Sequence, residues 1–134
     1  MTPEQRQDAE RLRRYIEREQ LGLVMNATKW REAVQALQAI PGFVVRFRVK
    51  TVRGPEPPAG HWEGGFPWHL PQPYAHIEWL DINPVVQRPR GVLVPDEVMD
   101  FTEQVTRALR VVNVPFVQQG QIIRIQGYVR PPVA

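Results

Sequence analysis

The sequence predicts an α+β protein in which a small antiparallel sheet of about four strands carries two to three helices on one face. Two patterns indicate this class. Three segments repeat apolar residues at helical spacing, and other segments alternate apolar and polar residues as strands do. The predicted order is α-α-β-β-α-β-β, and an antiparallel sheet with helices packed on one face is the economical solution for it.

Composition limits the function classes. The chain has 134 residues, 43% of them hydrophobic and 23% charged, which is typical of a globular protein. There is no cysteine, no long apolar run and no apolar leader, so we expect a cytoplasmic protein without disulfides, thiol chemistry or membrane contact. We expect a charged helix and link over 1–25, a single α+β domain over 26–130 and a tail over 131–134.

A charged helix is predicted from Thr2 to about Gln20. Thr2 can cap it, Pro3 suits its first turn, and a narrow apolar stripe contains Leu12, Tyr15 and Ile16. Two interpretations remain open: a salt-bridged helix docked on the domain, or an arm that regulates the protein or forms a homo-oligomer.

Two further helices follow from apolar periodicity. The first starts near Asn26 or Thr28 and ends at Pro41-Gly42. We expect Asp96 to cap the second, which stops at Asn113. Their apolar faces contain Trp30, Ala33, Val34, Leu37 and Ile40 in the first helix, and Val98, Phe101, Val105, Ala108, Leu109 and Val112 in the second.

Alternation predicts the strands. Residues 43–52, "FVVRFRVKTV", have one apolar and one basic face, and residues 75–82, "AHIEWLDI", place Ile77 and Trp79 toward the core. A short strand is also expected at 91–94. A final hairpin over 116–129 turns at Gln119-Gly120, with Arg124, Gln126 and Tyr128 pointing outward.

Several motifs resemble a small bacterial family of unknown function, DUF6678. They are "NATKW", "RFRVK", "HWEGGFPWHL", "IEWLDI" and a closing "VPF…GY", and they run from about Asn26 to Tyr128, so the first helix lies outside them. The resemblance implies no activity. It implies that these residues follow the family pattern: Thr28, Lys29, Trp30, Arg46, Arg48, Lys50, Trp62, Gly64, His69, Glu78, Trp79 and Asp81.

The predicted strands assemble a cationic sheet face away from the helices. It contains Arg46, Arg48, Lys50, His76, Glu78, Arg124, Gln126 and Tyr128. Cations two apart on one strand repel each other, and nearby acids are few. The face is therefore either an ordinary solvated surface or one that a loop or an anionic partner covers.

The loop over residues 60–76 concentrates aromatic residues, histidines and prolines. Its tryptophans are either anchors for a partner or part of the core. We expect Trp30 and Trp79 inside, and Trp62 and Trp68 lining a groove beside the cationic face. The candidate binding site thus combines Trp62, Trp68, His69, Arg46, Arg48, Lys50, Glu78, Arg124 and Tyr128.

Three function classes follow. The favoured one is a non-catalytic protein-binding module, of immunity or regulatory type, with another protein as its partner. One alternative is nucleic-acid binding through the basic face. The other is a small hydrolase using Glu78 with His76 or His69, although no motif for a nucleophile or phosphate loop accompanies them. The three histidines lack the spacing of a zinc site, and we expect neither metal nor cofactor.

Overall fold

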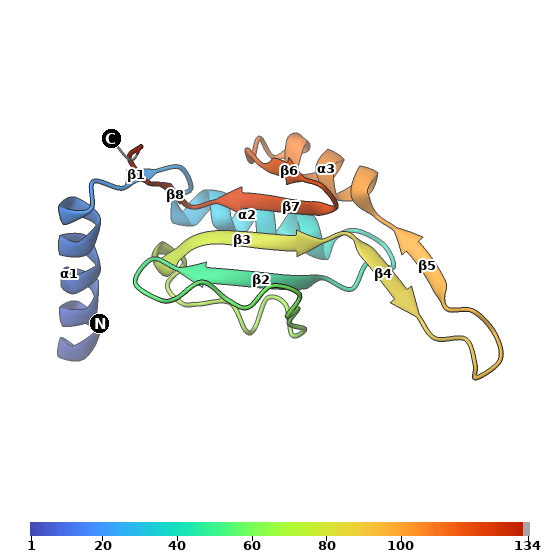
Figure 1. Ribbon diagram of the computed structural model, residues 1–134. Coiled ribbons are helices and arrows are strands. Elements are labelled where there is room, and N and C mark those ends of the chain that lie inside the picture. Colours follow the sequence, from blue (N-terminus) through green and yellow to red (C-terminus); the bar gives the residue numbers. More distant parts are fainter. Residues whose placement is uncertain (133–134) are drawn as a thin grey trace.

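The computed structural model describes residues 1–132, so residues 133–134 of the predicted tail lie outside the described part. Figure 1 shows a central sheet with a helical layer behind it, a helix at one end and a two-stranded arm at the other. The described elements are α1 (Pro3–Arg18), β1 (Gly22–Leu23), α2 (Ala27–Gln38), β2 (Arg46–Thr51), the 3-10 helix η1 (Tyr74–His76), β3 (Ile77–Asn83), β4 (Val85–Arg88), β5 (Glu97–Asp100), α3 (Thr102–Val111), β6 (Val117–Gln119), β7 (Ile122–Gln126) and β8 (Tyr128–Val129).

The central sheet has four antiparallel strands in the order β2-β3-β7-β6. α2 and α3 pack against one face of it, which confirms the predicted fold class and the expected number of strands (Figure 1). The hairpin between β6 and β7 turns where the sequence predicts, with Gly120 at a φ of 59° that favours glycine.

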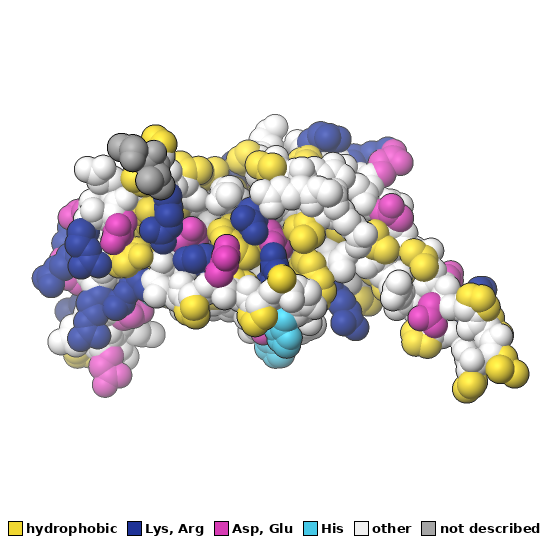
Figure 2. Space-filling model, viewed as in Figure 1, with side chains coloured by type: hydrophobic (Ala, Val, Ile, Leu, Met, Phe, Trp, Pro, Cys, Tyr) yellow, Lys and Arg dark blue, Asp and Glu magenta, His cyan; other side chains and the backbone are white. Residues whose placement is uncertain are grey.

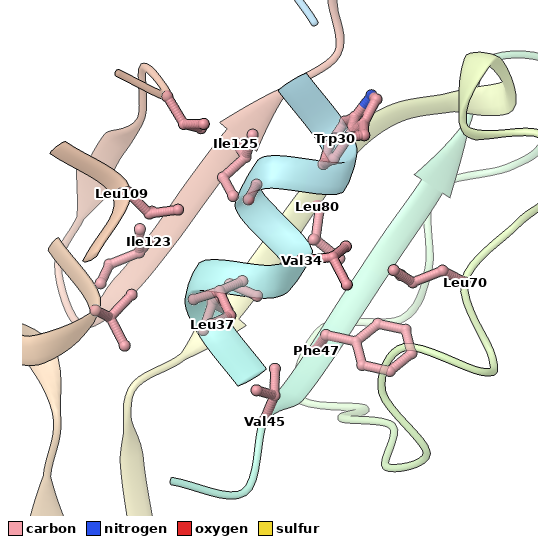
Figure 3. Close-up of a cluster of buried hydrophobic side chains, with 14 of the residues drawn as sticks. Trp30, Val34, Leu37, Val45, Phe47, Leu70, Leu80, Leu109, Ile123 and Ile125 are labelled. Carbon is pink, nitrogen blue, oxygen red and sulfur yellow. The ribbon is translucent and has the colours of Figure 1, made fainter. Parts of the chain in front are cut away.

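The hydrophobic core lies between this sheet face and the helices, as Figure 3 shows. Strand residues two apart point to the same side, so β2, β3 and β7 each send a row of apolar side chains inward. Trp30, Val34 and Leu37 of α2 and Leu109 of α3 fill the other side (Figure 3). The strand contribution consists of Phe47, Leu80, Ile82, Ile123 and Ile125.

The helical layer is capped and tied together by side chains. The side chain of Asn26 accepts a hydrogen bond from the backbone N–H of Lys29 at 2.9 Å and so caps α2, as predicted. The Lys29 ammonium donates to the carbonyl of Val112, the C-cap of α3, at 2.9 Å. A cation at a helix C-terminus complements the helix dipole, so Lys29 links the start of α2 to the end of α3.

A second, smaller hydrophobic cluster holds α1 against the end of the sheet. Leu12, with the partly buried Tyr15 and Ile16, packs against Leu21, Val52 and Tyr128. β1 pairs with β8 beside it. The capping box of Thr2 and Gln5 is present, so the predicted start of α1 is confirmed.

The segment before α3 differs from the prediction. Asp96 does not cap a helix: Glu97–Asp100 form β5, which pairs with β4, and residues 91–94 form the tip between these strands and not a strand of their own. α3 begins only at Thr102, where the Asp100 carboxylate accepts a hydrogen bond from the Thr102 N–H at 2.9 Å. The predicted apolar helix face is present from Phe101 onward. Val98, which was expected on the same face, lies exposed in the arm formed by β4 and β5.

Candidate functional site

The sheet face away from the helices carries most of the predicted binding residues. Directly opposite residues of antiparallel strands project to the same side. The register places Arg48 beside Asp81 and Lys50 beside Trp79, and β7 adds Arg124 opposite Asp81 and Gln126 opposite Trp79. Figure 2 shows this face, with basic and acidic side chains mixed over the sheet.

Asp81 is the centre of the first ion-pair cluster. Its carboxylate has no exposed surface and accepts hydrogen bonds from two arginines. Arg124 donates through Nε to Oδ1 at 2.7 Å and through Nη2 to Oδ2 at 3.1 Å, while Arg48 donates through Nη2 to Oδ2 at 2.9 Å. A fork of two parallel N–H groups on one carboxylate is among the strong charge-assisted arrangements, so this cluster fixes β2, β3 and β7 laterally.

Trp79 is buried within the same cluster. The Arg124 guanidinium lies 3.8 Å and that of Arg48 5.6 Å from its ring centroid, and Arg48 also lies 5.5 Å from the ring of Trp62. These are cation–π distances. Trp79 is thus buried, as expected. The prediction that it faces the core beside the helices is wrong, because it lies on the other face of the sheet and is covered by arginines.

A β-bulge explains the position of Trp79. The register shifts between Lys50 and Thr51, because Trp79 is opposite Lys50 whereas Ile77 is opposite Thr51. Glu78 is therefore the extra residue, and both it and Trp79 contact the charged face. Ile77 remains in the core, so the expected alternation from Ile77 to Trp79 is broken by one residue.

Glu78 is the centre of the second cluster. Lys50 donates to its Oε1 at 3.0 Å, and Arg130 donates to Oε1 at 2.7 Å and to Oε2 at 3.2 Å. Burial by itself would raise the pKa of Glu78, but the hydrogen bonds from Arg130 and Lys50 outweigh it and hold the pKa below its ordinary value. The hydrogen bond with Glu78 raises the pKa of Arg130.

The two clusters offset the repulsion that was expected among the cations of this face. Arg48, Lys50, Arg124 and Arg130 face two buried carboxylates, so attraction replaces repulsion at close range while the face keeps an excess of positive charge. Arg46 adds to this excess, since it is exposed and forms no ion pair with the described residues.

The aromatic loop, residues 60–76, lies along the outer edge of β2. Glu63 and Phe47 exchange backbone hydrogen bonds of 2.8 and 3.1 Å. Leu70 is buried, Phe66 packs edge-on against Phe47, and Tyr74 lies beside Trp30. Part of the loop therefore belongs to the core, which is one of the two interpretations that the sequence left open for this segment.

The rest of the loop is exposed. Trp68 has 84% of its surface open to solvent, and His61 and His69 are exposed as well. Gly65 has a φ of 78°, and the ring of His69 lies where a side chain at position 65 would be. Trp62 is half-buried against Arg48, so the two loop tryptophans differ in their exposure.

Two predicted site residues lie elsewhere. Tyr128 does not point outward. It is buried in the smaller hydrophobic cluster that holds α1 against the sheet, and its hydroxyl donates to the carbonyl of Ala75 at 2.9 Å. The chain bends at Gly127, where a side chain would collide with the carbonyl of Ile77, so the alternation of β7 does not continue to Tyr128. The Nε2 atom of His76, the last residue of η1, lies 3.1 Å from Oδ2 of Asp8 and so links α1 to η1.

Sequence reasoning missed the central role of Asp81 and the contribution of Arg130. A signal for Asp81 was present, because a carboxylate between Leu80 and Ile82 in an apolar strand needs a cation, and β2 offers several. Arg130 follows the kink at Gly127, so no periodicity connects it to the sheet.

Neither a metal centre nor a membrane span is seen in residues 1–132. No group of three His, Asp or Glu side chains there could hold a metal ion. No helix within the same range has the length and apolar character to cross a membrane.

The comparisons with known proteins identify a family. No match was found among curated proteins or among solved structures. A family model matches residues 12–132, which extends the resemblance seen in the motifs into the second half of α1. The chain, with its two ion-paired carboxylates on the sheet face and its exposed loop tryptophan, belongs to the family of unknown function DUF6678.

Proposed function

We propose that this protein is a bacterial protein-binding module, of immunity or regulatory type, that contacts its partner through Trp68 and the adjoining charged sheet face. The observation that carries the proposal is the 84% exposure of Trp68. Large aromatic side chains dominate the energetics of protein interfaces, and leaving an indole in water without a partner is unfavourable.

The surroundings of Trp68 support an anchoring role. Phe66 and Leu70, two residues away on either side, pack toward the core, so the backbone on both sides of the indole is held. An anchor that is held before binding loses less conformational freedom on association. In the same loop, His69 is exposed and the half-buried Trp62 lies 5.5 Å from the guanidinium of Arg48.

The charged face supplies the expected chemistry of the partner. Four cations against two carboxylates, together with the exposed Arg46, favour an acidic segment on the partner. Such complementarity increases the association rate and the salt dependence of binding.

The alternatives receive less support from the geometry. Nucleic-acid binding through the basic face would use Tyr128 and the loop tryptophans for stacking, and the ring of Tyr128 is buried, so the tryptophans alone would have to supply it. The hydrolase hypothesis needed Glu78 as an acid or base beside a histidine, but its carboxylate is engaged by Lys50 and Arg130, and its lowered pKa makes it a weak base.

The test compares Trp68→Ala with Val44→Ala, which removes another exposed apolar side chain, outside the loop. The immobilised chain is used to isolate partners from a lysate of its source bacterium, and the retained protein is purified for affinity measurement. Loss of a hot-spot tryptophan is expected to raise Kd about 30-fold, while Val44→Ala leaves it unchanged.

Both variants should unfold at the same denaturant concentration as the natural chain, because both side chains are exposed. Equal affinity of the natural chain and Trp68→Ala for the purified partner would refute the proposal. Arg46→Glu is expected to slow association and reduce its salt dependence if the partner surface is acidic.

A further inference from the structure

Four arginines from two separate elements surround a small hollow beside α1, with a volume of about 190 Å³. Arg11, Arg14 and Arg18 lie at i, i+3 and i+7 on α1 and therefore on one side of the helix. Arg53, in the turn after β2, and Tyr15 complete the lining of this arginine hollow. Figure 2 shows basic side chains gathered at the end of the molecule that holds α1.

The packing of α1 fixes the two sides of the arginine hollow relative to each other. Tyr15 packs against the smaller hydrophobic cluster, which contains the buried Val52, and Val52 directly precedes Arg53. The N–H of Gly54 donates to the carbonyl of Thr51 at 3.1 Å, so Arg53 lies within a hydrogen-bonded turn. The backbone that carries each arginine is thus held before any ligand arrives, which lowers the entropic cost of binding.

The lining of the arginine hollow does not compensate its positive charge. None of the lining residues is acidic. Arg11 and Arg53 form no ion pair with another residue of the described part of the chain. The sheet face differs, because buried carboxylates lie between its cations. Like charges that converge without such a carboxylate repel each other, so an anion in the hollow would relieve this repulsion.

The other two arginines have only loose contacts with acids outside the hollow. Nε of Arg14 lies 3.5 Å from Oε1 of Glu10, and Nε of Arg18 lies 3.8 Å from Oε1 of Glu19. Both arginine side chains are more than 70% exposed. Exposed pairs of this kind contribute little free energy, so Arg14 and Arg18 lose little when they turn to a stronger anion.

We propose that the arginine hollow binds the phosphate or diphosphate group of a soluble small molecule. Guanidinium groups present their N–H donors in a planar fork that matches the oxygens of phosphate. The hollow has the volume of about six water molecules at about 30 Å³ each, so it accommodates a small anion and not a folded chain. The site is independent of the partner contact through Trp68.

The apolar side chains of α1 favour a soluble ligand over the phosphates of a lipid surface. A helix that lies on a membrane inserts an exposed apolar face beside its basic one. The apolar stripe of α1 packs instead on Leu21, Val52 and Tyr128 of the domain. The arginines therefore have no apolar anchor beside them that would hold the chain on a bilayer.

The test is isothermal titration calorimetry with inorganic pyrophosphate as the probe, at low ionic strength, where screening is weak. We expect saturable binding by the natural chain. Arg11→Gln and Arg53→Gln remove donors from opposite sides of the hollow, and each should raise Kd at least about 10-fold. Arg6→Gln is the matched control, because it removes the same charge from an exposed position of α1 outside the hollow, and it should leave Kd nearly unchanged.

Urea denaturation provides a second readout. All three variants replace exposed side chains, so without pyrophosphate they should unfold at the same urea concentration as the natural chain. Saturating pyrophosphate should stabilise the natural chain, and Arg53→Gln should lose this gain. Absence of binding by the natural chain would overturn the proposal. So would equal weakening by Arg6→Gln, since binding would then follow net charge, or unchanged binding by Arg53→Gln, which would place the anion on α1 alone.

Two further probes test the chemical class and the source of the anion. Malonate carries two negative charges without the geometry of phosphate and should bind more weakly than pyrophosphate. Vesicles of phosphatidylcholine and phosphatidic acid present lipid phosphate and should not retain the chain in cosedimentation at the same ionic strength. Malonate binding as tight as that of pyrophosphate would refute a phosphate site, and retention on the vesicles that Arg53→Gln abolishes would refute a soluble ligand.

Discussion

Both faces of the central sheet contain fully buried side chains, but of opposite chemistry. On the helix side, Leu80 and Ile82 of β3 are buried among hydrocarbon. On the other side, Asp81 of the same strand is equally buried, but among guanidinium groups and the ring of Trp79. Neighbouring residues of one strand therefore depend on different forces.

The difference lies in how each face responds to a small change. Apolar packing degrades gradually, since removing a methyl group removes only its own contacts and burial. A buried carboxylate holding two arginines responds abruptly, because its loss leaves buried positive charges without compensation. The charged face should therefore be the more sensitive of the two to near-isosteric substitution.

The largest effect is expected for Asp81→Asn. The substitution keeps the shape but removes the charge that Arg48 and Arg124 share, which should lower the free energy of unfolding by about 3–5 kcal/mol. Urea denaturation at pH 7 measures this. A loss below about 1 kcal/mol would show that the cluster is dispensable and that the two faces do not differ as argued.

Glu78→Gln should have an intermediate effect. Hydrogen bonds to charged groups contribute about 1.5–3 kcal/mol, and Arg130 is 39% exposed, so water compensates part of the loss. The pKa of Glu78 is lowered by folding, so its stabilisation is full above the unfolded value near 4.5 and is lost as pH falls through the folded value.

Urea denaturation of both chains at several pH values checks this dependence. The stability difference between the natural chain and Glu78→Gln should be largest near neutrality and shrink below pH 4.5. A difference that stayed constant into acid would mean that the ionised carboxylate is not what stabilises this cluster.

A smaller effect is expected on the apolar face. Ile123→Val removes one methylene from a fully buried side chain and should cost about 0.5–1.5 kcal/mol. The same denaturation experiment applies. If this variant were destabilised as much as Asp81→Asn, the contrast between gradual and abrupt response would be refuted.

The smallest effect is expected for Glu103→Gln on α3. Its carboxylate forms an ion pair with Arg107 at 2.6 Å, but both side chains are at least 70% exposed. Exposed pairs four apart on a helix contribute about 0.3–0.5 kcal/mol. This variant is the matched control for Asp81→Asn, and a large loss here would show that burial is not the deciding variable.

The fold was predictable where a single period governs a whole segment. α2, β2 and the hairpin of β6 and β7 lie close to their predicted positions because their alternation or helical spacing is uninterrupted. The start of α3 was not predictable: Val98 and Phe101 have helical spacing, yet Val98 pairs with Gln87 in the arm. The competing partner, β4, contains only four residues and has no strong pattern of its own.

The candidate site was predictable only in part. The basic side chains of β2 and Arg124 lie on one face because simple alternation places them there. The partners that neutralise them were missed, since Trp79 was placed by alternation counted from Ile77, and the bulge at Glu78 shifts that count for Trp79 and for Asp81 after it. The exposure of Trp68 depends on the path of the whole loop, which no local pattern specifies.

The bulge in β3 also affects how related chains should be aligned. Because Glu78 is the extra residue, a relative lacking it would alternate regularly, with Ile77 still in the core and Trp79 still on the charged face. What such a relative would lose is the carboxylate that accepts hydrogen bonds from Lys50 and Arg130. A single-residue gap at this position would therefore mark the loss of one ion-pair cluster, whereas Asp81 and its arginines could be compared in relatives with or without the bulge.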